Sequence, residues 1–349
     1  MNRLKKGLVL FCLLGLLASL AGCSRNETPE PMGKAYFNWF DTVSYVYNYA
    51  GDPAELFDER SAGISGILTE YHRLFDIYHE YSGVNNLCTV NRLAGGDPVP
   101  VDEKLIDFLL YAEELHQKTD GEMNVVMGSV LKLWHDCRTL AGEDPASAHL
   151  PEEAALLEAA KHTDFSLLEI DRQAGTIRLT DPHAALDVGA LGKGYATEQA
   201  ARWLEAQGAS GYVLNIGGNI RIVGHKPDGG TWKTAVKNPE SPDTYYTTLD
   251  LADTSCVTSG NYERFFNVDG VQYHHIIDKD TLYPADHVAS ITVVVKDSGL
   301  ADALSTALFC MPPAEGLALA EAMGAEALWI FADGTMQHTS GMAAFFSKD

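Results

Sequence analysis

The chain has 349 residues, of which 46% are hydrophobic and 21% charged, a composition typical of a globular protein and too apolar for a disordered one. Its 25 Lys and Arg residues face 48 Asp and Glu residues, which gives a formal net charge of −23. This acidity excludes a general nucleic-acid binder, which needs a basic face, and a protein that docks on anionic lipid through a polybasic patch. A phosphate-bearing ligand would need a local feature to hold it.

The start of the chain is typical of a secretory signal, because Arg3, Lys5 and Lys6 precede a short apolar run and small residues follow it. The apolar run, Leu8–Leu20, is short for a membrane span of about 20 residues. Cys23 ends a segment that resembles the bacterial lipobox, in which the cysteine becomes the lipid-bearing first residue. We therefore expect a protein anchored in the lipid bilayer through Cys23, on the extracytoplasmic face of a bacterial cell membrane.

These features divide the chain into three parts. Residues 1–22 are the predicted signal, residues 23–35 are the lipidated cysteine and a tether, and residues 36–349 are one domain. The signal holds three basic residues and no acidic one, so its removal takes the formal charge from −23 to −26.

Besides Cys12 in the predicted signal and Cys23, the chain has four cysteines. They show no CxxC spacing, which argues against a zinc site. Their pairing stays open between free thiols and one or two disulfides, since export permits bridges and a chain of this length can fold without them. They are Cys88, Cys137, Cys256 and Cys310.

The first half of the domain is predicted to be mainly helical. Aromatic and β-branched residues predict an opening strand over Tyr36–Tyr49, and apolar residues at helical spacing predict a helix over Pro53–Ile77. Three further helices are expected over residues 102–121, 125–138 and 151–161, the first capped by Asp102 and the last with Pro151 in its first turn.

The second half is predicted to be rich in strands, with turn signals such as Asp269-Gly270 between them. This order of helices and hairpins favours an α+β (mixed α/β) fold over a doubly wound parallel sheet. Helices are expected over Tyr195–Gln207, Leu300–Phe309 and Glu315–Met323. Strands are expected over Leu167–Ile170, Thr176–Leu179, Ala185–Val188, Val213–Ile216, Ile220–Val223, Trp232–Val236, Phe265–Val268, Tyr273–Ile277, Ile291–Val295, Leu328–Ala332 and Met336–Thr339.

A glycine-rich turn, Asp187–Ala196, joins a predicted strand to a predicted helix. A helix start attracts anions, and Lys193 lies where it would meet a phosphate. The segment lacks both the Walker spacing GxxxxGK[ST] and the dinucleotide fingerprint GxGxxG. From the pattern alone, a phosphate site and a plain tight turn with a solvated Lys193 both stay open.

Two further groups carry candidate chemistry. Asp302 and Thr306 lie four residues apart on an apolar helix, so their oxygens share one face and could bind a hard cation, although Asp302 could equally cap the helix. His274 and His275 are neighbours in a predicted strand and point to opposite faces, which disfavours a two-histidine metal site. One of them could serve as a general acid or base, and the alternative is a polar strand face.

Taken together, these segments resemble the ApbE family, the FAD:protein FMN transferases. The resemblance extends more weakly from about Tyr36 to Ser347. The matching motifs are DxGxxxKGYA at Asp187–Ala196, GGN at Gly217–Asn219, SGxYER at Ser259–Arg264, HIID at His275–Asp278 with the turn Thr281–Pro284, and DALST at Asp302–Thr306.

The resemblance implies transfer of FMN from FAD to a Thr or Ser hydroxyl of an exported or membrane flavin-carrier protein, with AMP released. It implies a Mg²⁺ ion held by the Ala190 carbonyl, Asp302 and Thr306, with Ser305 adjacent. We hypothesise that His275 accepts the hydroxyl proton, so that His275 and Asp302 are the catalytic residues. Contacts to FAD are implied for Phe40, Tyr81, Glu122, Met123, Asn124, Asp187, Lys193 and the backbone of Ile276.

The sequence departs from the family pattern around the flavin. Phe40-Asp41-Thr42 replaces the family's MGT, Asn124-Val125 replaces aspartate-proline, and Lys279 and Leu282 replace a proline and a glycine. Two other functions fit the same motifs: a Mg²⁺-dependent FAD pyrophosphatase, in which water replaces the protein hydroxyl, and a non-catalytic FAD-binding lipoprotein.

Overall fold

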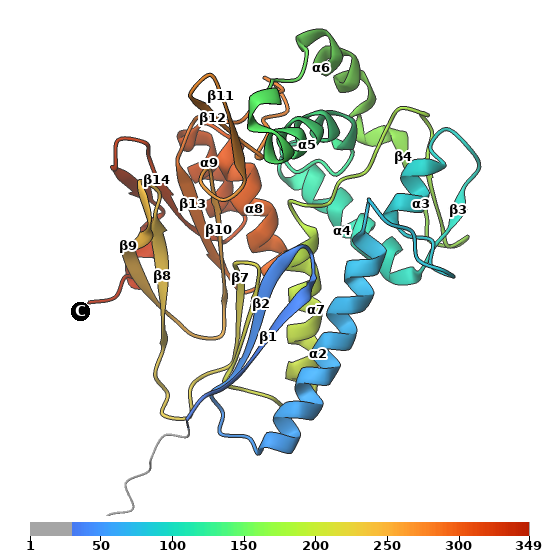
Figure 1. The fold of residues 1–349 in the computed structure, drawn as a ribbon. Coiled ribbons are helices and arrows are strands. Elements are labelled where there is room, and N and C mark those ends of the chain that lie inside the picture. The colour runs from blue at the N-terminus through green and yellow to red at the C-terminus, as the bar shows by residue number, and fades with distance from the viewer. Residues whose placement is uncertain (1–29, 349) are drawn as a thin grey trace, which may run out of the picture. The chain divides into compact units, whose positions relative to one another are not determined.

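An eight-stranded antiparallel sheet runs through the centre of the protein, in the strand order β1-β2-β6-β7-β10-β13-β14-β15. The computed structural model describes residues 30–348, and the chain from Pro31 onward forms one compact unit. The sheet has helices on one face and a two-stranded ribbon on the other (Figure 1). This arrangement confirms the predicted α+β fold with antiparallel sheets.

The chain enters this sheet through a hairpin of β1 (Met32–Trp39) and β2 (Thr42–Asn48). The prediction of one strand over residues 36–49 was wrong, because the chain reverses at Phe40 and Asp41. Both residues adopt left-handed backbone angles, with φ of 52° and 50°. Asp41 suits such a turn but Phe40 does not, so the pair lacks the recognisable signal of Asn-Gly or Asp-Gly and the reversal was missed. The strand also begins at Met32, inside the segment assigned to the tether.

In the rest of the sheet the first strand, β6, buries alternate residues, whereas β13 and β14 are buried on both faces because both faces of the sheet are covered there. A ribbon of β8 (Trp232–Asn238) and β9 (Ser241–Leu251) covers part of one face, where Trp232, Leu249 and Leu251 pack against it. The sequence patterns missed β9 and β10. The central strands are β6 (Tyr212–Ile216), β7 (Asn219–Val223), β10 (Ser255–Gly260), β13 (Ser290–Val295), β14 (Glu326–Ile330) and β15 (Met336–His338).

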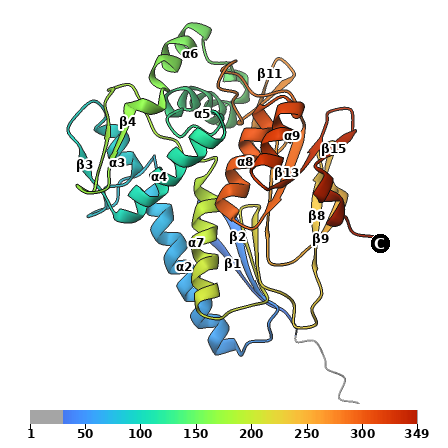
Figure 2. The same ribbon diagram turned by 180° about the vertical axis from the view of Figure 1, so that it is seen from behind.

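Three helices cover the opposite face, as both views of the ribbon show (Figures 1 and 2). They are α2 (Ala54–Phe75), α7 (Gly192–Ala206) and α8 (Ser298–Cys310), with α9 (Pro313–Ala322) packed beside α8. The predictions found all four, but α7 begins at Gly192 rather than at Tyr195, and α8 begins at Ser298 rather than at Leu300. These early starts bring the first turns of α7 and α8 together.

The remaining elements gather at one end of the molecule (Figure 1). The predicted strand over residues 185–188 is only a single bridge between Ala185 and Met127, and the strand predicted to end at Ile277 ends at His274. The elements are α3 (Leu87–Arg92), α4 (Glu103–Lys118), α5 (Gly128–Glu143), α6 (Glu153–Ala159), the sheet of β3 (Val99–Pro100), β5 (Thr176–Leu179) and β4 (Leu168–Asp171), the hairpin of β11 (Phe265–Val268) and β12 (Val271–His274), and the short 3₁₀ turns η1 (Pro145–Ser147), η2 (Ala160–His162) and η3 (Phe165–Leu167). The last 3₁₀ turn, η4 (Ser340–Ala344), packs instead against β14.

The predicted signal and Cys23 lie outside the described residues, so the lipid anchor stays a prediction. Within residues 30–348, none of the helices combines the length and the apolar character that a membrane crossing requires.

Candidate functional site

The starts of α7 and α8 share a hydrogen bond at the centre of the candidate site. The N–H of Gly194 donates to Oδ2 of Asp302 over 2.7 Å. The helices are so close that a Cβ atom on Gly194 would lie 2.3 Å from the Ser298 carbonyl oxygen, which only glycine avoids. Gly194 lies in the first turn of α7, whose N–H groups have no partner within the helix, so Asp302 supplies one. The Ala190 carbonyl, just before the helix, accepts no backbone hydrogen bond from the residues that the structure describes.

Asp302 is a buried carboxylate, 4% exposed. Burial raises its pKa, while Lys193 and hydrogen bonds from Gly194 and Asn219 act in the opposite direction. The Oδ1 atom of Asn219 is itself buried without a hydrogen-bond partner. A buried carboxylate beside unpaired oxygens suits a hard cation, which would offset the cost of burying the charge.

Ser305 and Thr306 play different parts on α8. The Ser305 hydroxyl donates to the Asp302 carbonyl over 2.9 Å and lies 2.8 Å from the Ser259 hydroxyl, so it fastens α8 to β10. Thr306 is half-buried, and its hydroxyl has no hydrogen bond to any residue that the structure describes. Thr306 is therefore the freer of the two for a cation.

Among residues 30–348, no three His, Cys, Asp or Glu side chains come together as a metal-binding group. Ala190, Asp302 and Thr306 offer oxygens of the kind that Mg²⁺ takes, an ion that keeps part of its water or binds a substrate phosphate. The four cysteines of this part of the chain are free thiols.

The glycine-rich turn holds Asp187 and Lys193 beside this centre. The Asp187 carboxylate accepts a hydrogen bond from the Gly189 N–H over 2.8 Å, and the Lys193 ammonium donates to the Gly189 carbonyl over 3.1 Å. Burial raises the pKa of Asp187. Asn91, which the sequence analysis did not single out, fixes the approach to this turn, since its side chain bonds both the N–H and the carbonyl of Leu186 at 2.7 and 2.9 Å.

Phe40 and Tyr81 belong to one aromatic group. The Phe40 ring meets the edge of His72 at 5.6 Å, and His72 lies 6.5 Å from the Tyr81 ring. The Tyr81 hydroxyl donates to Asp76 over 2.8 Å, and burial together with this carboxylate raises the pKa of Tyr81 to about 12. The structure thus brings together two residues that are 41 positions apart in the sequence.

The side chains of Glu122, Met123 and Asn124 lie in three different environments. Glu122 forms an ion pair at 3.2 Å with Lys279, one of the positions that depart from the family pattern. Met123 is buried in the main core. The Asn124 amide donates to the Thr163 carbonyl over 2.8 Å, so its side chain already has a partner in the protein.

The two histidines have separate environments. His274 is buried and its Nε2 lies 2.9 Å from the Ala285 carbonyl. The Nδ1 of half-buried His275 lies 3.2 Å from the Arg264 carbonyl and must carry a proton to donate to it, which leaves Nε2 free to accept one. Burial, with the positive charges of Arg264, Arg138 and Lys193, lowers the pKa of His275 to about 3. Ile276 is buried beside it.

Lys193 lies near several of the predicted site residues, since its charge affects the pKa of Asp187, of Asp302 and of His275. Two arginines near His275 were missed. Arg264 ends the Ser259–Arg264 motif and could have been identified there, whereas nothing in the sequence marked Arg138.

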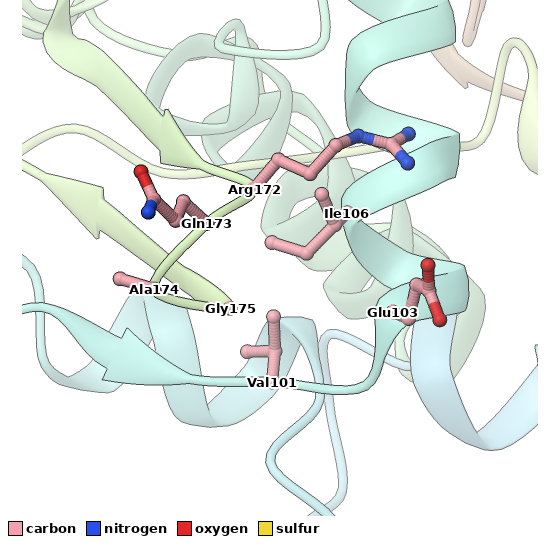
Figure 3. A pocket seen from close by; sticks show the side chains of 7 residues that line it. All are labelled: Val101, Glu103, Ile106, Arg172, Gln173, Ala174 and Gly175. Atoms are coloured by element: carbon pink, nitrogen blue, oxygen red, sulfur yellow. The ribbon is translucent and has the colours of Figure 1, made fainter.

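A pocket of about 280 Å³ between α4 and the β4–β5 turn holds none of the predicted site residues (Figure 3). Its one arginine, Arg172, pairs with Asp107. The pocket is therefore separate from the candidate site.

Known proteins resemble this chain over most of its length. A protein of Treponema pallidum named FAD:protein FMN transferase is 33% identical over 274 residues, 73% of each chain. One of the same name from Vibrio cholerae is 28% identical over 96% of this chain and 98% of its own. The crystal structure of the ApbE protein of Thermotoga maritima has a TM-score of 0.80 at 26% identity, covering 91% of this chain and all of that one. The sequence model of the ApbE family matches residues 42–329, and this chain belongs to that family.

Proposed function

We propose that this protein is an FAD:protein FMN transferase that uses Mg²⁺ and modifies a Thr or Ser hydroxyl of a partner protein. The hydroxyl oxygen forms a bond to the phosphorus of the FMN half, the phosphoanhydride bond breaks, and AMP leaves with the bridging oxygen. The observation that carries the proposal is the buried Asp302 carboxylate at the joined starts of α7 and α8, beside Lys193 and the free Ala190 carbonyl.

Mg²⁺ at Ala190, Asp302 and Thr306 would neutralise charge that develops on the phosphates. The protein itself supplies positive charge, because Lys193 and the start of α7 favour an anion. A bound cation would offset the cost of burying the Asp302 charge, and it would attract the phosphates to the same point.

His275 is the group that we propose to accept the hydroxyl proton. Its Nε2 is unprotonated at neutral pH, but a pKa of about 3 makes a weak base. Phosphates bound near Arg264, Arg138 and Lys193 would offset the charges that lower this pKa. Substrate binding would therefore raise the pKa of His275 toward the range in which it accepts a proton well.

Exchange of His275 for asparagine is expected to lower the rate of transfer by about 10²–10⁴-fold, the usual value of a general base. FAD affinity should change little. Single-turnover measurement of AMP release at saturating FAD separates the two effects. A variant with the normal rate would remove His275 from the mechanism.

The test of the function is incubation with FAD, Mg²⁺ and a candidate flavin carrier, followed by mass spectrometry of the carrier and chromatography of the nucleotides. A carrier heavier by one FMN, with AMP released in equal amount, supports the transferase. Free FMN and AMP with an unmodified carrier would instead show the pyrophosphatase. Bound but unconverted FAD would show a binding protein. The lipid anchor on Cys23 places this carrier on the extracytoplasmic face of the membrane in our proposal, and labelling with a fatty acid tests it.

The turn at Phe40 and Asp41 gives a separate prediction. Both residues hold left-handed angles, which cost a bulky side chain free energy that a binding role could explain. The double change F40N/D41G is expected to stabilise the fold by about 1 kcal/mol, because asparagine and glycine favour this turn. FAD affinity should fall at the same time. Thermal unfolding and flavin fluorescence titration measure the two effects, and unchanged FAD affinity would contradict a flavin contact at Phe40.

A further inference from the structure

Two arginines approach the candidate site from elements that pack together. Helix α5 and strand β11 are joined by Trp134, whose ring centroid lies 6.3 Å from that of Phe266. Arg138 follows Trp134 by one turn of α5, and Arg264 is the exposed residue that directly precedes β11, so both lie next to this contact. The contact between the rings therefore brings Arg138 and Arg264 to one place.

Neither arginine has a carboxylate partner within 4 Å among the residues that the structure describes. Most other arginines of this part of the chain do have one, as expected in so acidic a protein: Arg60, Arg92, Arg172, Arg178, Arg202 and Arg221. Each of the two also repels the other, since burial and the charge of Arg264 lower the pKa of Arg138. Two unpaired guanidinium groups near enough to repel each other create a local positive potential that attracts an anion.

Arg138 is held in place by neutral groups. Its Nη2 donates to Nδ1 of His135 over 3.1 Å, and the Tyr78 hydroxyl lies 3.3 Å from the same nitrogen. Because that nitrogen accepts a hydrogen bond, His135 is neutral. Burial and Arg138 lower the pKa of His135, which keeps it so. His135 therefore holds the Arg138 guanidinium in place and, because it is neutral, does not offset the positive charge.

Arg264 is fixed through its backbone. Its carbonyl accepts hydrogen bonds from the N–H of His275 at 3.1 Å and from the His275 ring at 3.2 Å. Asp187 is the carboxylate that most directly affects the surroundings, since its charge acts on both Arg138 and Tyr78. Asp187 forms no ion pair with either arginine, so both guanidinium groups stay open to a ligand.

We propose that Arg138 and Arg264 form a guanidinium pair that binds the diphosphate of the dinucleotide from the α5 and β11 side, while Lys193 approaches it from the α7 side. This inference rests on the proposed function for the identity of the ligand. A guanidinium group offers two parallel N–H donors that match two phosphate oxygens, whereas Lys193 offers a point charge. The pair would orient the phosphates next to His275, where the acceptor hydroxyl loses its proton.

The test compares three probes, FAD, riboflavin and inorganic pyrophosphate, at one fixed Mg²⁺ concentration. Arg138→Met and Arg264→Met are each expected to weaken FAD and pyrophosphate binding about tenfold. Riboflavin, which has no phosphate, should bind as before. Arg138→Lys should restore only part of the affinity, because lysine lacks the second donor. Arg172→Met, in the separate pocket of Figure 3, is the matched control and should change none of the three.

Unchanged FAD and pyrophosphate affinity in both methionine variants would overturn the inference, as would an equal loss for riboflavin, which would show a role in the fold. The outcome is separable from the function. If the variants lose pyrophosphate binding while the wild type fails to modify any carrier, the guanidinium pair stands and the transferase falls. If the wild type transfers FMN and the variants keep full affinity, the transferase stands and the pair falls.

Discussion

Replacing Asp302 with asparagine is expected to lower FMN transfer at least about a hundredfold while the fold is kept. Asparagine retains an oxygen that can accept the hydrogen bond from the Gly194 N–H, so α7 and α8 stay joined. It removes the one negative charge of the proposed Mg²⁺ ligands. The loss of activity then reports on the charge and not on the packing.

The measurement is kcat/KM for AMP release as a function of Mg²⁺ concentration, together with thermal unfolding of both proteins. Asp58→Asn is the matched control, because Asp58 lies on α2 in an exposed ion pair with Lys34, and such pairs contribute little. Full activity of D302N at the same Mg²⁺ concentration would disprove the cation site. Partial activity recovered only at high Mg²⁺ would support it.

Adding a methyl group at Gly194 is expected to lower the free energy of unfolding strongly. The added Cβ would lie 2.3 Å from the Ser298 oxygen and 2.4 Å from Cβ of Asp302, so the two helices would have to move apart. Gly194→Ala should cost about 3 kcal/mol of unfolding free energy. The melting temperature should fall by about 5–10 °C. Activity should fall as well, since Asp302 moves with α8.

Gly66→Ala provides the control for this change. Gly66 lies in the middle of α2, and a Cβ there would meet nothing within 4 Å. Alanine favours a helix over glycine by up to about 1 kcal/mol, so this variant should be slightly more stable than the wild type. Equal melting temperatures for the two variants would show that position 194 does not require glycine for the close approach of α7 to α8.

Much of the fold was predictable from the sequence, because amphipathic helices and β-branched strands have clear periods. The α2 helix and the β13 strand were identified on this ground. Errors occurred where the local signal was absent. The reversal at Phe40 and Asp41 lacks a recognisable turn pair such as Asn-Gly, and the polar β9 strand depends on pairing with β8 rather than on its own alternation.

The candidate site was predictable in part. The motifs contained Asp187, Lys193 and Asp302, and the structure places Lys193 where its charge acts on both carboxylates. Arg138 could not be found, because its nearness to Arg264 arises from the packing of Trp134 on Phe266 across more than a hundred residues. A contact of that kind has no local signature. The net charge of −23 likewise gave no indication that the positive charges of Lys193, Arg138 and Arg264 act at one place.

The hydrogen bond between Gly194 and Asp302 also gives the protein a built-in spectroscopic probe. The resonance frequency of an amide proton depends on the charge of the oxygen that it faces, so the NMR signal of this one backbone proton reports the ionisation of a carboxylate hidden from solvent. Titration with acid, with a divalent ion or with a nucleotide would shift the same peak in distinguishable ways. Glycine amides are well separated in such spectra, which allows the state of Asp302 to be followed without any label at the site itself.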